Sequence, residues 1–265
     1  MLDEKRAIAK IIPRLARVLI VDPQPQAARL LSELLRDLAR SQTVSASSTV
    51  RAYELAKDFN PQIIFVESAG PELDGCKLVR AIRRSELACR EAPVVMVTST
   101  ATAASIMAAR DAGVHEFLRK PFTTKDLVRR LLAVTLQERM WIEAMNYIGP
   151  DRRRFNSAEY AGPRKRRSDP RELSEPAKIR QALAILKSAV EATGRDPVQA
   201  LRSMQAQGVE LHRAATAVND IALSLAAKGF QDYLAAMAGQ PLNPAAIAPR
   251  AAPLLAFEPT YATAA

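Results

Sequence analysis

The first half of the chain alternates short apolar runs with longer amphipathic segments, and this alternation constrains the fold more than any other feature. Because the apolar runs are continuous and rich in β-branched residues, they are typical of strands buried on both faces. Strands separated by helical segments pair in parallel and carry helices on both sides of the sheet. The sequence therefore predicts an α/β fold, a doubly wound five-stranded parallel sheet, with strands at 17–21, 44–46, 63–66, 93–97 and 116–118.

Polar residues follow four of these strands, at the edge of the sheet where open α/β folds place their sites. These residues are Asp22, Glu67, Thr98 and Lys120. Together with Pro71, Asp74-Gly75 and the Lys120-Pro121-Phe122 phrase, the set closely resembles the receiver domain of two-component response regulators. The resemblance covers residues 16 to about 134. It implies a flavodoxin-like strand order, a CheY-like signalling domain that is not an enzyme, and a cis bond between Lys120 and Pro121.

Two of the three acidic positions of a receiver are changed in this chain. Receivers hold Mg²⁺ with two adjacent acidic residues after the first strand and with an Asp after the third, and that Asp accepts phosphate from a histidine kinase. The resemblance assigns the first acidic position to Asp22 and the phosphoryl-binding positions to Thr98 and Lys120. Pro23 replaces the second acid and offers no ligand, and Glu67 replaces the phosphoacceptor. A carboxylate misplaced by about 1 Å can cost on the order of 100-fold in rate.

The resemblance therefore predicts a pseudo-receiver with weakened Mg²⁺ binding, in which Lys120 pairs permanently with Glu67. No other metal or cofactor site is expected. Phe117 occupies the place of the switching aromatic of receivers, and His115, in the turn that begins at Gly113, is expected to face solvent. The alternative is a phosphorylatable receiver in a phosphorelay, with the chemistry at Glu67 or a neighbour.

One short stretch holds nearly half of the net charge of +10. Residues 146–172 carry 8 basic and 4 acidic residues, and they contain two near copies of one phrase, Tyr-Ile-Gly-Pro-Asp-Arg-Arg-Arg at 147–154 and Tyr-Ala-Gly-Pro-Arg-Lys-Arg-Arg at 160–167. A solvated basic linker is one interpretation. A linker has no need of an ordered repeat, however, and guanidinium groups bind phosphates and guanine bidentately. The candidate anion-binding residues are Asp151, Arg152, Arg153, Arg154, Arg164, Arg166 and Arg167.

The repeated phrase resembles the arginine-rich extensions of CheY-like proteins that bind cyclic di-GMP. This resemblance implies cyclic di-GMP as the ligand and another signalling protein as the partner. Nucleic acid and an anionic membrane surface are the alternatives. A DNA-binding regulator is disfavoured because no basic recognition helix follows, and residues 173–265 carry a net charge of only +1.

The last third has helical patterning and is assigned to no known family. Ser174 and Asp196 are expected to cap two helices, the second ending by Gly208, and a third is expected from about 209 to 226 or beyond. The predicted order is an N-terminal arm (1–15), a receiver with an extended last helix (16–145), an arginine-rich connector (146–172), a small all-α output or dimerisation unit (173–238) and a disordered Ala- and Pro-rich tail (239–265). No apolar run has the roughly 18 residues of a membrane span, so a cytoplasmic protein is expected.

Overall fold

A computed structural model describes residues 9–136, 139–152, 174–240 and 242–262 of the 265-residue chain. These residues form two compact units. The first, called the α/β unit, includes the described residues within Met1–Ile142 and Tyr147–Tyr160. The second, called the helical unit, includes those within Glu143–Asn146 and Ala161–Ala265.

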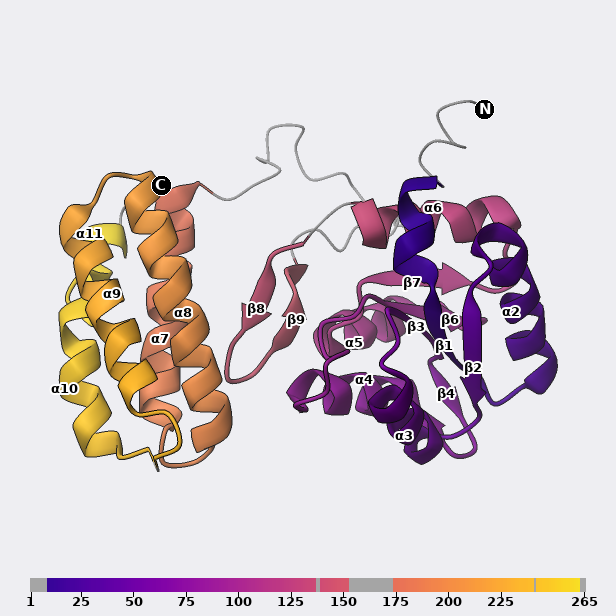
Figure 1. Ribbon diagram of the computed structural model, residues 1–265, viewed down its shortest axis with the longest axis horizontal. Helices are drawn as coiled ribbons and strands as arrows, with labels where there is room; N and C mark the ends of the chain where they lie inside the picture. The colour runs from indigo at the N-terminus through magenta and orange to yellow at the C-terminus, as the bar shows by residue number, and fades with distance from the viewer. Residues whose placement is uncertain (1–8, 137–138, 153–173, 241, 263–265) are drawn as a thin grey trace. The chain divides into compact units, whose positions relative to one another are not determined.

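The α/β unit contains the predicted five-stranded parallel sheet (Figure 1). All neighbouring strands pair in parallel, in the order β2-β1-β3-β6-β7. The strands are β1 (Arg17–Val21), β2 (Gln42–Ala46), β3 (Ile63–Glu67), β6 (Val94–Thr98) and β7 (Glu116–Arg119). The order reverses beside β1, where a doubly wound sheet forms its crevice.

Helices cover both faces of this sheet, as the continuous apolar runs predict (Figure 1). On β1, Leu19 and Val21 belong to one buried core and Val18 and Ile20 to the other. The first core includes residues of α3, α4 and α5, and the second includes residues of α2 and α6. The helices are α2 (Pro25–Ala39), α3 (Thr49–Phe59), α4 (Gly75–Arg84), α5 (Ala103–Ala112) and α6 (Thr124–Leu136).

Asp74 and Gly75 each have a structural role at the start of α4. Asp74 caps α4, because its carboxylate accepts a hydrogen bond of 2.8 Å from the backbone N–H of Lys77. A Cβ atom on Gly75 would lie 2.3 Å from the carbonyl oxygen of Glu67, so only glycine fits against the end of β3. The short strands β4 (Ala69–Gly70) and β5 (Leu73–Asp74) pair between β3 and α4. This turn fixes the position of Glu67.

The predicted N-terminal arm is wrong for its described residues. The 3₁₀ helix η1 (Ile12–Leu15) lies against the sheet, and Ile11 and Leu15 are fully buried with residues of α2 and α6. Both are apolar side chains, and burying each contributes about 1.5–3 kcal/mol. This segment therefore belongs to the α/β unit.

The predicted extension of the last helix to residue 145 is also wrong, because α6 ends at Leu136. The chain continues into two short strands that form their own sheet, β8 (Trp141–Glu143) and β9 (Ile148–Pro150). Tertiary contacts outweigh helix propensity here: the Trp141 ring lies 5.2 Å from the guanidinium of Arg83, and Tyr147 and Ile148 are buried. The first residues of the predicted connector thus belong to folded structure, and 153–172 lie outside the described residues.

The helical unit packs its helices around a single buried core (Figure 1). Ser174 and Asp196 cap helices as predicted. Gly208 does not end the second helix; it lies within α8, where a Cβ atom would come 3.1 Å from Gln231 Cγ, so the glycine permits close packing against α9. The helices are α7 (Glu175–Ala192), α8 (Pro197–Ala217), α9 (Ile221–Ala236), α10 (Pro244–Leu255) and α11 (Glu258–Ala262).

The predicted disorder of residues 239–265 is wrong, since α10 and α11 lie in this range. Ile247, Ala251 and Leu254 recur at helical spacing and are fully buried in the core of the helical unit. Their burial outweighs the cost of Pro249 and Pro253 inside the helix. Among the described helices of the chain, none is long and apolar enough to cross a membrane.

Candidate functional site

The four predicted polar residues meet at the carboxyl edge of the parallel sheet. Asp22 follows β1, Glu67 ends β3, Thr98 ends β6 and Lys120 follows β7. These strands are consecutive neighbours and run in the same direction, which brings residues far apart in the sequence together. The cis peptide bond between Lys120 and Pro121, implied by the resemblance, is also present.

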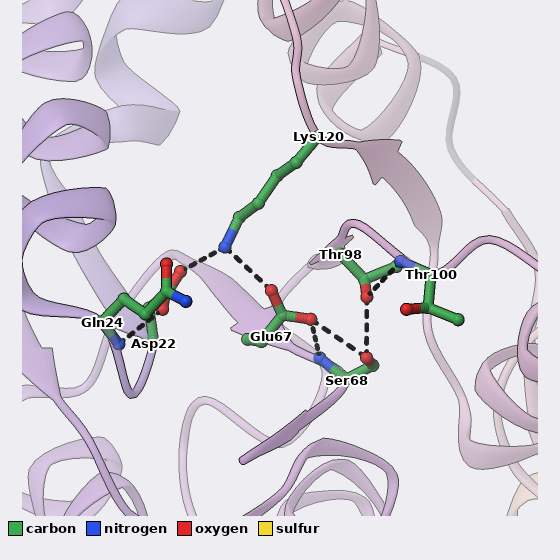
Figure 2. Close-up of polar contacts among 7 residues, drawn as sticks. All are labelled: Asp22, Gln24, Glu67, Ser68, Thr98, Thr100 and Lys120. Atoms are coloured by element: carbon green, nitrogen blue, oxygen red, sulfur yellow. Dashed lines mark hydrogen bonds and ion pairs between the residues drawn. The ribbon is translucent and has the colours of Figure 1, made fainter.

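Lys120 forms ion pairs with two carboxylates. Its Nζ lies 2.6 Å from Asp22 Oδ2 and 2.8 Å from Glu67 Oε2, as Figure 2 shows. The side chains of Asp22 and Glu67 are only 7% and 11% exposed, so these pairs are weakly screened by solvent. Burial on its own would lower the Lys120 pKa, but hydrogen bonds to Asp22 and Glu67 outweigh it and raise that pKa. The predicted pairing of Lys120 with Glu67 is therefore present, with Asp22 as a second partner.

Ser68 completes the site and was missed by the sequence analysis. Its backbone N–H and its hydroxyl both donate to Glu67 Oε1, at 2.8 Å and 3.0 Å. The same hydroxyl oxygen lies 2.8 Å from Thr98 Oγ1, which in turn accepts from the backbone N–H of Thr100 (Figure 2). Only its adjacency to Glu67 could have pointed to Ser68. Thr98 thus lies in a continuous network with Glu67.

The remaining carboxylate oxygen, Asp22 Oδ1, accepts from the backbone N–H of Gln24 at 2.8 Å. Every carboxylate oxygen of Asp22 and Glu67 therefore has a donor within the chain. Pro23 adds no ligand, and its ring lies so close to Gly70 that a Cβ atom there would come 2.7 Å from Pro23 Cγ. Mg²⁺ prefers several oxygen ligands in octahedral geometry. This donor set, with an ammonium group between two carboxylates, does not fit Mg²⁺ well.

Residues 18–132 match the family described as the response regulator receiver domain. The chemotaxis protein CheY of Pseudomonas aeruginosa is 32% identical over 115 residues, which are 43% of this chain and 92% of that protein. CheY-3 of Vibrio cholerae is 31% identical over 121 residues, 46% of this chain and 92% of that protein. The chain belongs to the response regulator receiver family.

One solved structure, of Vibrio cholerae CheY4, is 24% identical with a TM-score of 0.43 and covers 45% of this chain and 98% of its own. The receiver match ends at residue 132, so the helical unit lies outside it. Residues 18–132 of the α/β unit form a receiver domain of two-component signalling, and receiver domains interact with signalling partners. Phe117, which the resemblance assigns to the switching-aromatic position, is buried in the receiver core.

Of the predicted arginine segment, the structure describes Asp151 and Arg152. The Arg152 side chain lies over the Tyr147 ring, 4.4 Å from its centroid, and Nη1 is 3.0 Å from Asp111 Oδ1. Asp111 lies in α5, just before the turn that leads into β7, whereas Lys120 follows β7. Arg152 and the Lys120 site therefore lie toward opposite ends of the receiver sheet. Arg153, Arg154, Arg164, Arg166 and Arg167 lie outside the described residues.

A buried arginine lies at the amino end of the same sheet. Arg83 is 1% exposed, and Nε and Nη2 donate to the carbonyl oxygen of Gly113 at 3.2 Å and 3.0 Å. Nη1 donates to the carbonyl oxygens of Ala92, at 2.9 Å, and of Arg90. Burial lowers the Arg83 pKa to about 10, so the group stays charged at neutral pH. One side chain thereby joins α4 to the starts of β6 and β7.

His115 is buried beside Arg83, so the expectation that it faces solvent is wrong. Its Nδ1 accepts from the backbone N–H of Val94 at 3.2 Å and lies 3.3 Å from Arg83 Nη2. Both contacts require an unprotonated Nδ1. Burial, with the nearby charges of Arg83 and Arg139, lowers the His115 pKa well below its ordinary value.

We expect His115 to make the receiver sensitive to mild acid. An unfolded histidine takes up a proton below pH 6.5 while folded His115 does not, so stability falls as pH drops below that value. The loss between pH 7 and pH 5 is at most about 2 kcal/mol in the free energy of unfolding, which is the proton uptake of one ordinary histidine over this range. Urea unfolding at several pH values measures it. A His115→Gln variant keeps an acceptor for Val94 but has no imidazole, so its free energy of unfolding is expected to fall less than that of the parent between pH 7 and pH 5. Parallel pH profiles for the two proteins would contradict the assignment.

Proposed function

We propose that this chain is a two-component-type signalling protein whose receiver domain is a pseudo-receiver acting through protein–protein interaction. The observation that carries the proposal is the Lys120 ammonium group held between Asp22 and Glu67. In a phosphorylated receiver a lysine at this position would contact the phosphoryl group. Here Asp22 and Glu67 both supply anionic partners to Lys120 from within the chain, and the proposed receiver acts without phosphotransfer.

The lengthened acidic side chain supports the same conclusion. Glu67 contacts Lys120 with one oxygen and Ser68 with the other, and its carboxylate lies one methylene group farther from the backbone than that of an aspartate. An acceptor aligned for in-line attack needs a free oxygen at a set position, and a shift of about 1 Å can cost on the order of 100-fold in rate. The proposed receiver therefore takes up phosphate from acetyl phosphate slowly or not at all.

The second part of the proposal is that the arginine-rich segment binds an anionic ligand such as cyclic di-GMP. Support comes from the repeated Tyr-x-Gly-Pro phrase and from the described part of its first copy, residues 147–152, which is folded. The Tyr147 hydroxyl donates to the carbonyl oxygen of Pro150 at 2.5 Å, and Gly149 has φ 153° beside Gly113. Residues 147–152 thus have a defined backbone that contains β9 and ends in Arg152, as a ligand-binding motif requires and a plain linker does not.

Calorimetric titration with cyclic di-GMP tests this part. The variant Arg152→Ala, Arg153→Ala, Arg154→Ala is expected to bind at least about tenfold more weakly, since arginine contacts to phosphate are strong charge-assisted hydrogen bonds. The matched control is Arg80→Ala, Arg84→Ala, Arg129→Ala, which removes three exposed positive charges elsewhere on the receiver. Equal heats for the parent and the first variant would contradict the proposal, and equal losses in both variants would reduce it to general electrostatics.

A further inference from the structure

Arg152 is held at the surface of the receiver by an acidic residue of the receiver itself. Its Nη1 is 3.0 Å from Asp111 Oδ1, and one face of its guanidinium lies over Tyr147. Tyr147 is 7% exposed, and its hydroxyl is fixed on Pro150. The ring is therefore a rigid support for the Arg152 guanidinium. The Asp111 carboxylate accepts a hydrogen bond from a guanidinium N–H group that could otherwise donate to a phosphate oxygen.

The backbone brings Arg152 and Asp111 close together. A Cβ atom on Gly149 would lie 2.8 Å from Gly113 Cα, and a Cβ atom on Gly113 would lie 2.7 Å from the carbonyl oxygen of Ile148. Both positions are glycine, and both have positive φ values, so the two turns approach closely. This approach places residue 152 beside the end of α5, where Asp111 lies.

A dissolved anion can displace Asp111 from Arg152, in contrast to the buried ion pairs of Glu116 nearby. The Arg152 and Asp111 side chains are 46% and 42% exposed. Glu116, which pairs with Arg130 and Arg139, is 7% exposed between partners of 4% and 8%. Exposed pairs of the first kind contribute little to stability, whereas breaking a buried pair is costly. A competing anion would therefore exchange with Asp111 and leave Glu116 untouched.

Releasing Arg152 would not leave Asp111 without a positive partner. Arg110 keeps two contacts to the same oxygen, with Nε at 3.1 Å and Nη2 at 3.0 Å. Burial would raise the Asp111 pKa, but the hydrogen bonds from Arg152 and Arg110 outweigh it and hold that pKa below its ordinary value. Asp111 thus stays ionised at neutral pH, and the exchange leaves no unpaired charge behind.

We propose that Asp111 is an internal anion that occupies Arg152 until a phosphate group of a nucleotide ligand displaces it. The inference rests on the proposed function of the arginine segment and adds a regulatory contact to it. The carboxylate competes with the ligand for the same guanidinium donor, and the Tyr147 ring stays stacked against Arg152 in both states.

The test compares Asp111→Asn with the parent protein, using the full chain. The amide keeps the shape and the contact with Arg110 but removes the competing charge. Calorimetry with cyclic di-GMP and with inorganic pyrophosphate is expected to give about threefold to fivefold tighter binding in the variant. Unchanged or weaker binding in the variant would overturn the proposal.

A control and a second measurement separate this proposal from the proposed function. Asp126→Asn removes an equal charge from a half-exposed aspartate that pairs with Arg129 and accepts from Thr123, and it is expected to leave the affinity unchanged. Without any ligand, phenylglyoxal should modify Arg152 about threefold faster in Asp111→Asn than in the parent, measured by peptide mass spectrometry. Equal rates would overturn the internal-anion role. No binding of cyclic di-GMP by either protein would contradict the proposed ligand, and the modification rates would still decide the role of Asp111.

Discussion

Replacing Arg83 with methionine is expected to lower the free energy of unfolding of the receiver by about 3–4 kcal/mol, because the change leaves buried carbonyl oxygens without a donor. The guanidinium supplies hydrogen bonds to Gly113, Ala92 and Arg90. Methionine fills a similar volume and offers none of them. The loss therefore measures the hydrogen bonding of Arg83 more than its packing.

The single tryptophan of the chain reports this unfolding directly. Trp141 lies 5.2 Å from the Arg83 guanidinium, so its fluorescence follows the receiver in a urea titration. The matched control is Arg84→Met, one position along α4 on the exposed side, for which we expect a change within about 0.5 kcal/mol. A loss in Arg83→Met no larger than in the control would show that the carbonyls find other donors.

The variant Pro23→Asp, Glu67→Asp is expected to take up one phosphoryl group from acetyl phosphate, in the presence of Mg²⁺, at least about 100 times faster than the parent protein. The second acidic residue restores an oxygen ligand for the metal beside Asp22. Shortening residue 67 by one methylene group withdraws its carboxylate from the direct contacts with Lys120 and Ser68. Lys120 and Thr98 are already in position at the same strand ends.

Intact mass against time measures this uptake. The matched control is Pro23→Asp, Glu67→Gln, whose amide accepts no phosphoryl group and should stay unlabelled. A parent protein labelled as fast as the aspartate variant would contradict the pseudo-receiver proposal and favour the phosphorelay alternative. Labelling of the glutamine control would instead point to a neighbouring acceptor, of which Ser68 is the nearest hydroxyl to Glu67.

The site at the strand ends was predictable because strand position alone determines it. Asp22, Glu67, Thr98 and Lys120 each stand at the carboxyl end of an apolar run, and parallel pairing brings such ends together. Ser68 and the contact of Lys120 with Asp22 were not predictable. They depend on side-chain rotamers and on the short β4–β5 turn, which leave no periodic signal in the sequence.

The errors have a common cause, which is packing between segments distant in the sequence. Residues 239–262 look disordered by composition, yet Ile247, Ala251 and Leu254 are buried with the other helices. Residues 139–150 look helical or flexible, yet the Trp141 ring lies beside Arg83 of α4, and Gly149 lies against Gly113, just after α5. The sequence suggests that His115 lies in a solvent-exposed glycine turn. Its ring is instead buried, because it packs against Arg83 and the start of β6.

By itself, the sequence determined the sheet, its two covered faces and the residues at its carboxyl edge, because those follow from hydrophobic period and chain order. The resemblance to receivers also predicted that Glu67 and Pro23 depart from receiver chemistry. Only the tertiary structure decided that Lys120 is shared by two carboxylates, and that Arg152 lies on Tyr147 and Asp111 toward the other end of the sheet. The ion pairs among these contacts join residues 41 to 98 positions apart, and such pairs form only when the folded backbone brings them within hydrogen-bonding distance.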